Sequence, residues 1–199
     1  MYKRQELGLL DVPFLAAHCV WISPQDMELM VRHGSYVLSC PRSNLKLASG
    51  IAPLTAMLEK GVNVSLGTDG VASNNKLSMM EEMTYAALLQ KGTTYNPQAI
   101  PAAQAIDMAT RQGAKAMGFE SGVIEAGKNA DIIMLNTDGI RYTPDYDIVS
   151  NVAVSYTHLR IRGLRRARAA RGTPFCPGGK SRPQVRRKPW FFLHRQGSG

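Results

Sequence analysis

Three groups of polar side chains in this sequence each follow a short apolar run. His18 follows PFLAA, Ser43 and Asn44 follow YVLSC, and Asp69 follows VNVSL within the segment GTDGVASNN. A carboxylate such as that of Asp69 can bind a hard or borderline cation and accept a proton from the cation's water. A neutral imidazole such as that of His18 can bind the metal or hydrogen-bond the attacking hydroxide. Together, these residue types could perform metal-assisted hydrolysis.

Simpler interpretations of the same residues stay open. An Asp in a Gly-Thr-Asp-Gly turn is common as a turn former, and a single His after a strand is common as a satisfied residue at the edge of a core. A catalytic zinc site usually has three protein ligands, whereas the sequence offers Asp69 and, at most, His18. His33 is expected to cap a helix C-terminus, and His158 and His194 lie in the basic last part of the chain. The residues alone do not complete a zinc site.

Apolar runs and helix signals alternate along the first 120 residues. Ser23 and Asp26 form a capping-box pattern around Pro24, which is typical of a helix start. The expected strands are 12–20, 36–40 and 62–67, the expected helices are 24–34, 53–61, 78–91 and 101–118, and 41–50 is expected to be a loop. This alternation favours a parallel α/β sheet, whose strands end at one shared edge. The segment 122–136 is expected to be a turn followed by a strand of a separate small β unit.

Charge is distributed unevenly along the 199 residues. Residues 1–155 hold 12 Lys and Arg against 15 Asp and Glu, a net charge of 12 − 15 = −3, whereas residues 156–199 hold 12 basic residues and no acid. The basic segment has no usable apolar period, so we expect it to form no packed domain. The three cysteines form no C-x-x-C pair, no apolar run is long enough to span a bilayer, and no P-loop or G-x-S-x-G motif is present. We therefore expect a cytoplasmic protein without a disulfide framework.

Five longer motifs occur along the chain: AAHCV, SNLKLASGIAP, LGTDGVASNN, MATRQGAKAMG and GVIEAGKNADIIML. Over about residues 6–154 the sequence resembles the C-terminal part of a metal-dependent amidohydrolase, most closely the 5-methylthioadenosine/S-adenosylhomocysteine deaminase group. The resemblance implies the α/β fold of a partial (β/α)8 TIM-type barrel, with its last three β/α units in residues 6–120. Residues 121–154 would then return into a small β-sandwich domain.

The resemblance also implies roles for individual residues. Asp69 matches the aspartate that binds the metal and shuttles protons, His18 matches the histidine that steadies the attacking hydroxide, and Ser73 matches a pocket serine that contacts substrate. The implied enzyme is a zinc-dependent aminohydrolase, with one Zn²⁺ per site, that deaminates methylthioadenosine or S-adenosylhomocysteine and releases ammonia. Its expected partner is a small nucleoside, with no membrane or nucleic acid, and a homo-oligomer is left open. Ser39-Cys40 departs from the family's usual His followed by Asn or Cys, which leaves the exact substrate open.

The family's other metal-binding histidines have no match here, so we interpret the chain as a fragment that is inactive by itself. Residues 1–5 (MYKRQ) and 155–160 (SYTHLR) resemble adapter-derived sequence, and 155–199 is interpreted as a basic tail translated out of frame. Two alternatives stay open. One is another amidohydrolase, such as a guanine deaminase or a chloro- or triazine hydrolase. The other is a nucleic-acid-binding protein acting through residues 156–199, where Trp190, Phe191 and Phe192 would supply stacking groups.

Overall fold

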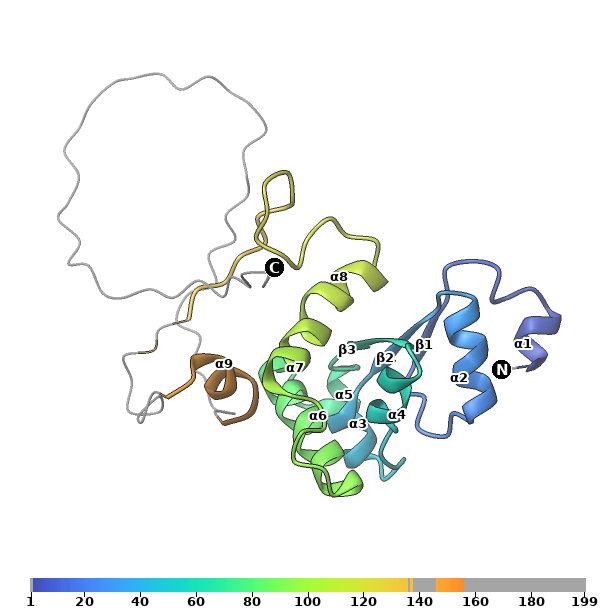
Figure 1. The fold of residues 1–199 in the computed structure, drawn as a ribbon, viewed down its shortest axis with the longest axis horizontal. Helices are drawn as coiled ribbons and strands as arrows, with labels where there is room; N and C mark the ends of the chain where they lie inside the picture. The colour runs from blue at the N-terminus through green and yellow to red at the C-terminus, as the bar shows by residue number, and fades with distance from the viewer. Residues whose placement is uncertain (1, 136, 138–145, 156–199) are drawn as a thin grey trace, which may run out of the picture.

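A three-stranded parallel sheet lies at the centre of the described part of the chain (Figure 1). The computed structural model describes residues 2–135, 137 and 146–155. Strand β1 (Leu15–Ala17) pairs with β2 (Tyr36–Ser39), and β2 pairs with β3 (Asn63–Leu66), so that the order is β1-β2-β3. Both pairs are parallel. The predicted α/β arrangement with a parallel sheet is therefore confirmed.

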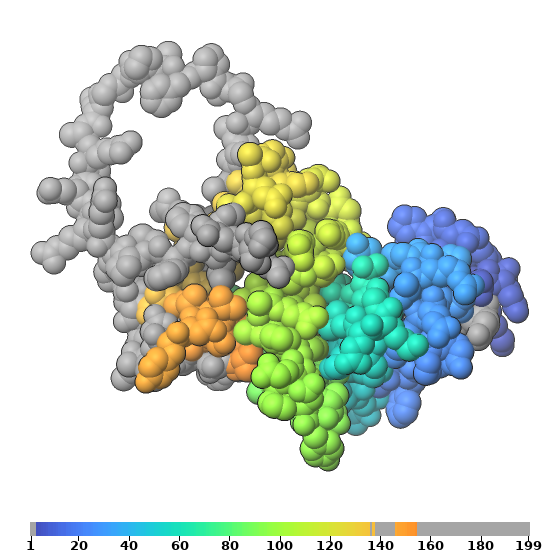
Figure 2. Space-filling model, viewed as in Figure 1, coloured from blue at the N-terminus to red at the C-terminus, as the bar shows by residue number. Residues whose placement is uncertain are grey.

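Helices connect the strands and cover the sheet. They are α1 (Tyr2–Glu6) before β1, α2 (Pro24–Arg32) between β1 and β2, and α3 (Pro41–Lys46) and α4 (Leu54–Glu59) between β2 and β3. After β3 come α5 (Val71–Asn74), α6 (Met79–Thr94), α7 (Ala102–Ala109), α8 (Arg111–Ala116), α9 (Ile148–Ser150) and a π-type turn, η2 (Asn151–Ser155). Helices α4, α6, α7 and α8 contact β3. Figure 2 shows residues 146–155, in orange, against the green surface of α6 and α7, which η2 contacts.

The ends of α2 follow directly from its sequence. The Asp26 amide donates to Ser23 Oγ at 3.1 Å, and the Ser23 amide donates to Asp26 Oδ2 at 3.2 Å. At the other end, the His33 amide donates to the Leu29 carbonyl at 3.0 Å, and Gly34 takes the left-handed conformation that lets the chain leave the helix. The predicted capping box and the predicted C-terminal cap are both confirmed.

The core is one apolar cluster between the sheet and its covering helices. Val37 of β2 and Val64 of β3 are fully buried in it, together with Met30 and Met57. Methionine side chains are flexible enough to fill the irregular space between a sheet and crossing helices. Met83 of α6 is buried in the same cluster. The packed core gives the ends of the strands a fixed position.

Two segments near the strand ends differ from the sequence prediction. Residues 41–46 form α3 instead of a loop, and Pro41 occupies the first turn of that helix, where its missing amide hydrogen costs nothing. The strand expected over 12–20 forms only from Leu15 to Ala17. It ends there because His18 and Cys19 have positive φ angles, at 65° and 48°, which an extended strand does not allow.

Later segments also depart from the prediction. The helix expected over 101–118 is divided at Thr110, whose φ and ψ of −121° and −83° are not helical. The helix expected over 78–91 continues to Thr94. Among residues 122–135 no strand forms, and Leu135 makes only an isolated bridge, since this segment has no paired partner strand in the described part of the chain. The β-sandwich prediction is therefore untested, as is the division of the chain into domains.

The predictions for the basic segment, including Trp190, Phe191 and Phe192, fall on residues 156–199, outside the described residues. Within the described ranges, no helix combines the length and the apolar character needed to cross a membrane.

Candidate active site

The carboxyl ends of the three parallel strands bring the predicted site residues together. His18 directly follows β1, and its amide donates to the Leu38 carbonyl of β2 at 2.9 Å. Asp69 follows β3 after Gly67, whose amide donates to the Ser39 carbonyl at 2.9 Å. These bonds extend the sheet by one residue on each side of β2. As a result, His18 Nε2 lies 4.0 Å from Asp69 Oδ2, and the prediction that the two residues share one edge of the sheet is confirmed.

Helix α3 holds both of these side chains. Ser43 Oγ donates to Asp69 Oδ2 at 2.6 Å, and the next residue, Asn44, accepts a hydrogen bond from His18 Nδ1 through Oδ1 at 2.8 Å. Because Asn44 Oδ1 accepts from Nδ1, Nε2 is the ring nitrogen that faces Asp69. Ser43 and Asn44 are both buried, which fixes their rotamers. Ser43 and Asn44 were expected at the site, but their orienting role depends on long-range contacts that no local pattern in the sequence indicates.

The Asp69 carboxylate is strongly stabilised in its ionised form. The hydrogen bond from Ser43, the nearby Ser73 hydroxyl and the Gly70 amide together lower the pKa of Asp69 to about 2. The Gly70 amide donates to Oδ1 at 2.7 Å. The side chain is 32% exposed, so the anion is open to solvent on one side. An oriented, accessible and ionised carboxylate of this kind suits a cation ligand.

Backbone strain occurs at eight described non-glycine residues, and His18 and Asp69 are two of them. His18 and Asp69 have positive φ angles of 65° and 61°, in the left-handed region that costs a non-glycine residue about 1–2 kcal/mol. Both angles turn the chain sharply at the end of a strand. Such strain persists only where the surrounding hydrogen bonds hold it, and it is concentrated at functional sites.

Ser73 lies on α5, four residues after Asp69. Its hydroxyl donates to the Gly70 carbonyl at 3.0 Å and is half-buried beside the Asp69 carboxylate. The predicted contact between Ser73 and a substrate stays a prediction.

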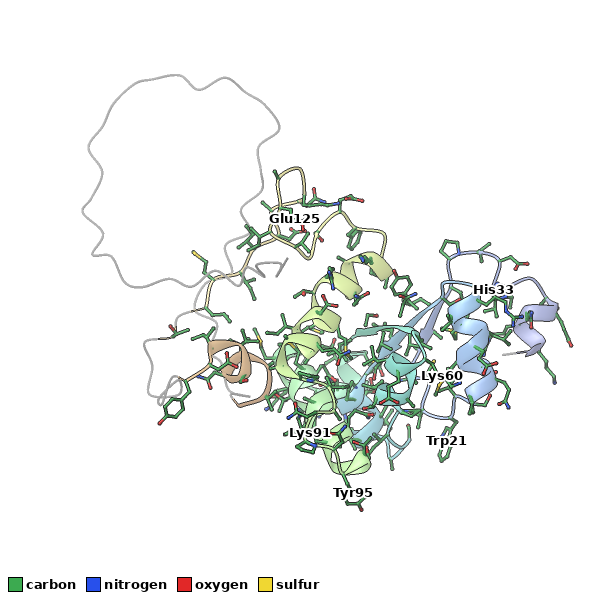
Figure 3. All side chains as sticks on the ribbon, viewed as in Figure 1. Trp21, His33, Lys60, Lys91, Tyr95 and Glu125 are labelled. Atoms are coloured by element: carbon green, nitrogen blue, oxygen red, sulfur yellow. The ribbon has the colours of Figure 1, made fainter. Side chains whose placement is uncertain are left out.

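A metal site is only partly represented among the described residues. No group of three or more His, Cys, Asp or Glu side chains in that part of the chain could hold a metal ion. His33 ends α2 at the opposite edge of the sheet, where its Nδ1 lies 3.5 Å from Asp11 Oδ1 (Figure 3). Asp69 fits one ligand position, because its carboxylate is ionised, oriented and accessible. The described cysteines, Cys19 and Cys40, do not fit, since burial raises the pKa of their thiols to about 11 and about 12.

Comparison with known families identifies the chain. The model of the amidohydrolase family matches residues 1–163. This chain belongs to the amidohydrolase family. The motifs on which the resemblance rested, including LGTDGVASNN and GVIEAGKNADIIML, all lie within the matched range.

Two of the curated relatives that the chain resembles are named as adenosine-type deaminases. The 5'-deoxyadenosine deaminase of Methanosarcina barkeri is 50% identical over 162 residues, which cover 81% of this chain and 38% of that protein. The 5-methylthioadenosine/S-adenosylhomocysteine deaminase of Moorella thermoacetica is 48% identical over 149 residues, covering 74% of this chain and 35% of the relative. The chain therefore spans somewhat more than a third of the length of these relatives.

Solved structures agree with this assignment. An adenosine deaminase from Xanthomonas campestris with bound zinc superposes with a TM-score of 0.75 and 35% identity, covering 77% of this chain and 36% of that one. A guanine deaminase from C. acetobutylicum with bound guanine gives a TM-score of 0.65 and 28% identity, covering 75% of this chain and 36% of that one. The shared fold thus occurs in deaminases of different purines.

Proposed function

We propose that the described residues form part of the active site of a hydrolytic deaminase that acts on an adenine nucleoside and releases ammonia. The observation that carries this proposal is the pair of His18 and Asp69, 4.0 Å apart at the carboxyl edge of the sheet and each held by a neighbouring residue of α3. The identity to two adenosine-type deaminases, at 50% and 48%, supports adenine as the base.

The proposed roles follow from the hydrogen bonding of each side chain. Asp69 would hold a divalent metal as one ligand, accept a proton from the hydrolytic water and pass it toward the leaving amine. His18 would use Nε2 to interact with the attacking oxygen, because Asn44 occupies its Nδ1. Ser73 would contact the nucleoside. When bound, zinc would supply a water of lowered pKa and a positive charge at the reacting centre.

Several finer predictions belong to the same proposal. They are the TIM-type barrel as the complete fold, zinc as the metal, a cytoplasmic location and a small nucleoside as the partner. The zinc-bound Xanthomonas campestris deaminase supports the choice of metal. Of the two alternatives, another amidohydrolase, such as a guanine deaminase or a triazine hydrolase, has support, since a guanine deaminase shares the fold at 28% identity. This identity is lower than the 50% and 48% to the two adenosine-type deaminases, so guanine deamination is the second candidate.

A chimera tests the proposal, because the chain spans 38% of the length of the Methanosarcina barkeri deaminase. Residues 6–154 of this chain would replace the aligned residues of that enzyme. We expect ammonia release from 5'-deoxyadenosine and methylthioadenosine, with a much lower kcat/KM for ammonia release from guanine and for chloride release from a chlorotriazine. A higher kcat/KM for guanine or the triazine would favour the alternative, and turnover of none of the four would refute the proposal.

Variants of the chimera test the two residues. Asp69→Asn should lower kcat by at least about a hundredfold, because an amide neither accepts the proton nor binds a cation well. His18→Ala should lower kcat by a similar factor, on the scale of losing one group that stabilises the transition state. The matched control is Asp11→Asn, which alters another carboxylate that faces a histidine, at the opposite edge of the sheet. Equal activity of the Asp69→Asn and Asp11→Asn chimeras would contradict the role of Asp69.

A further inference from the structure

A buried asparagine, Asn74, ties the loop that carries Asp69 to the neighbouring helix. Its Nδ2 donates to the carbonyl of Thr68, the residue just before Asp69, at 2.6 Å, and to Glu82 Oε1 on α6, also at 2.6 Å. Asn74 and Glu82 are both completely buried. The two amide protons of Asn74 are therefore both used, one in a bond to the Asp69 loop and the other in a bond to α6.

The same buried carboxylate also holds the start of α3. Glu82 Oε2 accepts from the backbone amide of Arg42 at 3.1 Å, and Arg42 Nε donates to the Asn74 carbonyl at 3.1 Å. Arg42 directly precedes Ser43 in the chain. Its guanidinium also pairs with Glu81 on α6. Glu82 thus uses one oxygen for the Asp69 loop and the other for the helix that carries Ser43.

These bonds join the loop that carries Asp69 to helix α3, whose Ser43 orients the Asp69 carboxylate. The peptide between Thr68 and Asp69 leads into the positive φ of Asp69, so a bond to the Thr68 carbonyl restrains the strained turn. Lys46 of α3 also bonds to the loop, donating to the Ala72 carbonyl at 2.6 Å and to Asn75 Oδ1 at 2.8 Å. A buried carboxylate is costly unless each oxygen is hydrogen-bonded, and apolar side chains could fill the same space. The polar network therefore contributes directional bonds that an apolar contact would lack.

We propose that Asn74 and Glu82 are positioning residues, which hold the loop 67–75 against α3 so that Ser43 Oγ meets Asp69 Oδ2. Neither residue touches the reacting atoms. Their effect on turnover rests on the proposed deaminase function, whereas their effect on the geometry of the loop does not.

Amide hydrogen exchange on the 199-residue chain tests the positioning directly. In Asn74→Ala, protection of the Gly70 amide, which donates to Asp69 Oδ1, should fall about tenfold relative to the amides of β2 and β3. Glu82→Gln keeps the shape of the side chain but replaces one acceptor oxygen by a donor, so it should lower the same protection by a smaller factor. This second variant preserves the test if the alanine variant does not fold.

Gln90→Ala is the matched control. Gln90 lies on the same helix and is also buried, but it bonds to a different segment, the start of α4, through the Thr55 amide and the Ala52 carbonyl. It should lower protection at residues 52–55 and leave the Gly70 amide unchanged relative to the strands. If Glu82→Gln leaves Gly70 protection unchanged, or Gln90→Ala lowers it equally, the positioning role is wrong.

Kinetics of the chimera separate this inference from the proposed function. With an active chimera, Asn74→Ala and Glu82→Gln should lower kcat more than they raise KM, because the loop positions Asp69 for the reaction. A chimera that releases no ammonia while the Gly70 amide responds as expected would refute the deaminase proposal and leave the positioning role supported.

Discussion

Replacing Ser43 by Ala should raise the pKa of the Asp69 carboxyl from about 2 to about 3. The Ser43 hydroxyl donates to Asp69 Oδ2 at 2.6 Å and is the largest cause of the lowered pKa. A hydrogen bond to a charged group is worth about 1.5–3 kcal/mol, and a change of one in pKa corresponds to about 1.4 kcal/mol. Because the Asp69 side chain is 32% exposed, water replaces part of the lost bond, so we expect the lower end of that range.

The direction of the pH dependence follows from the lowered pKa. The pKa of Asp69 lies below its unfolded value of 3.8, so the stabilisation is fully present above about pH 3.8 and is lost as the pH falls through about 2. In the Ser43→Ala protein the remaining stabilisation is smaller and disappears at about pH 3. The variant should thus be less stable than the parent at neutral pH, and the difference should shrink in strong acid.

Carbon-13 NMR of the Asp69 carboxyl, followed from about pH 6 to about pH 1.5, measures the change directly. Ser35→Ala is the control, since Ser35 is also buried and its hydroxyl has no hydrogen-bond partner within the described residues. An Asp69 pKa that stays near the parent value in Ser43→Ala, or rises equally in Ser35→Ala, would refute the role assigned to the Ser43 hydroxyl.

Two further predictions concern the fold and the metal. Gly122→Ala should destabilise the chain by about 3 kcal/mol, measured by urea unfolding. Two costs add here: the left-handed φ of a non-glycine residue and the overlap of the new Cβ with the backbone of a neighbouring segment. Gly122 has a φ of +86°, and a Cβ there would lie 2.8 Å from the Thr110 carbonyl oxygen. Gly61→Ala, at a φ of +83° with no atom within 4 Å, should cost only about 1–2 kcal/mol, and equal losses would show that the close approach is not responsible. Removing metal from the chimera with a chelator should abolish ammonia release and zinc should restore it, whereas full turnover by a metal-free preparation would contradict the metal role of Asp69.

Strong local signals made much of the sheet region predictable. Strands β2 and β3 formed almost where the apolar runs 36–40 and 62–67 placed them, because each run follows a helix-ending glycine and contains β-branched or aromatic residues that favour strands. Helix α2 was predictable too, because the Ser23 cap and the Gly34 that ends the helix depend only on residues nearby in the sequence. Residues 41–46 were missed because PRSNLK contains several loop-forming residues, and its helix depends on tertiary contacts of Arg42, Ser43 and Asn44.

The site was only partly predictable from the sequence. His18 and Asp69 could be placed together, since the carboxyl ends of parallel strands must meet at one edge. Their partners could not be derived in the same way. Hydrogen bonds from Ser43 to Asp69 and from His18 to Asn44 each join residues 26 positions apart. Glu82 looked like an ordinary residue in the first turn of α6, where acidic side chains are common, and only the fold brings it to Asn74.

The arrangement of α3 has a consequence for how the pair of His18 and Asp69 is maintained. The two residues belong to strands on opposite sides of β2, so small movements of either strand would change the distance between their side chains. Ser43 and Asn44 are adjacent on one helical turn, which fixes their separation. Because each holds one member of the pair, α3 sets the distance between His18 Nε2 and Asp69 Oδ2. Glu82 then fixes α3 and the Asp69 loop to α6 at once. The proposed reaction, in which Asp69 binds the metal and transfers the proton while His18 contacts the attacking oxygen, requires this kind of fixed separation.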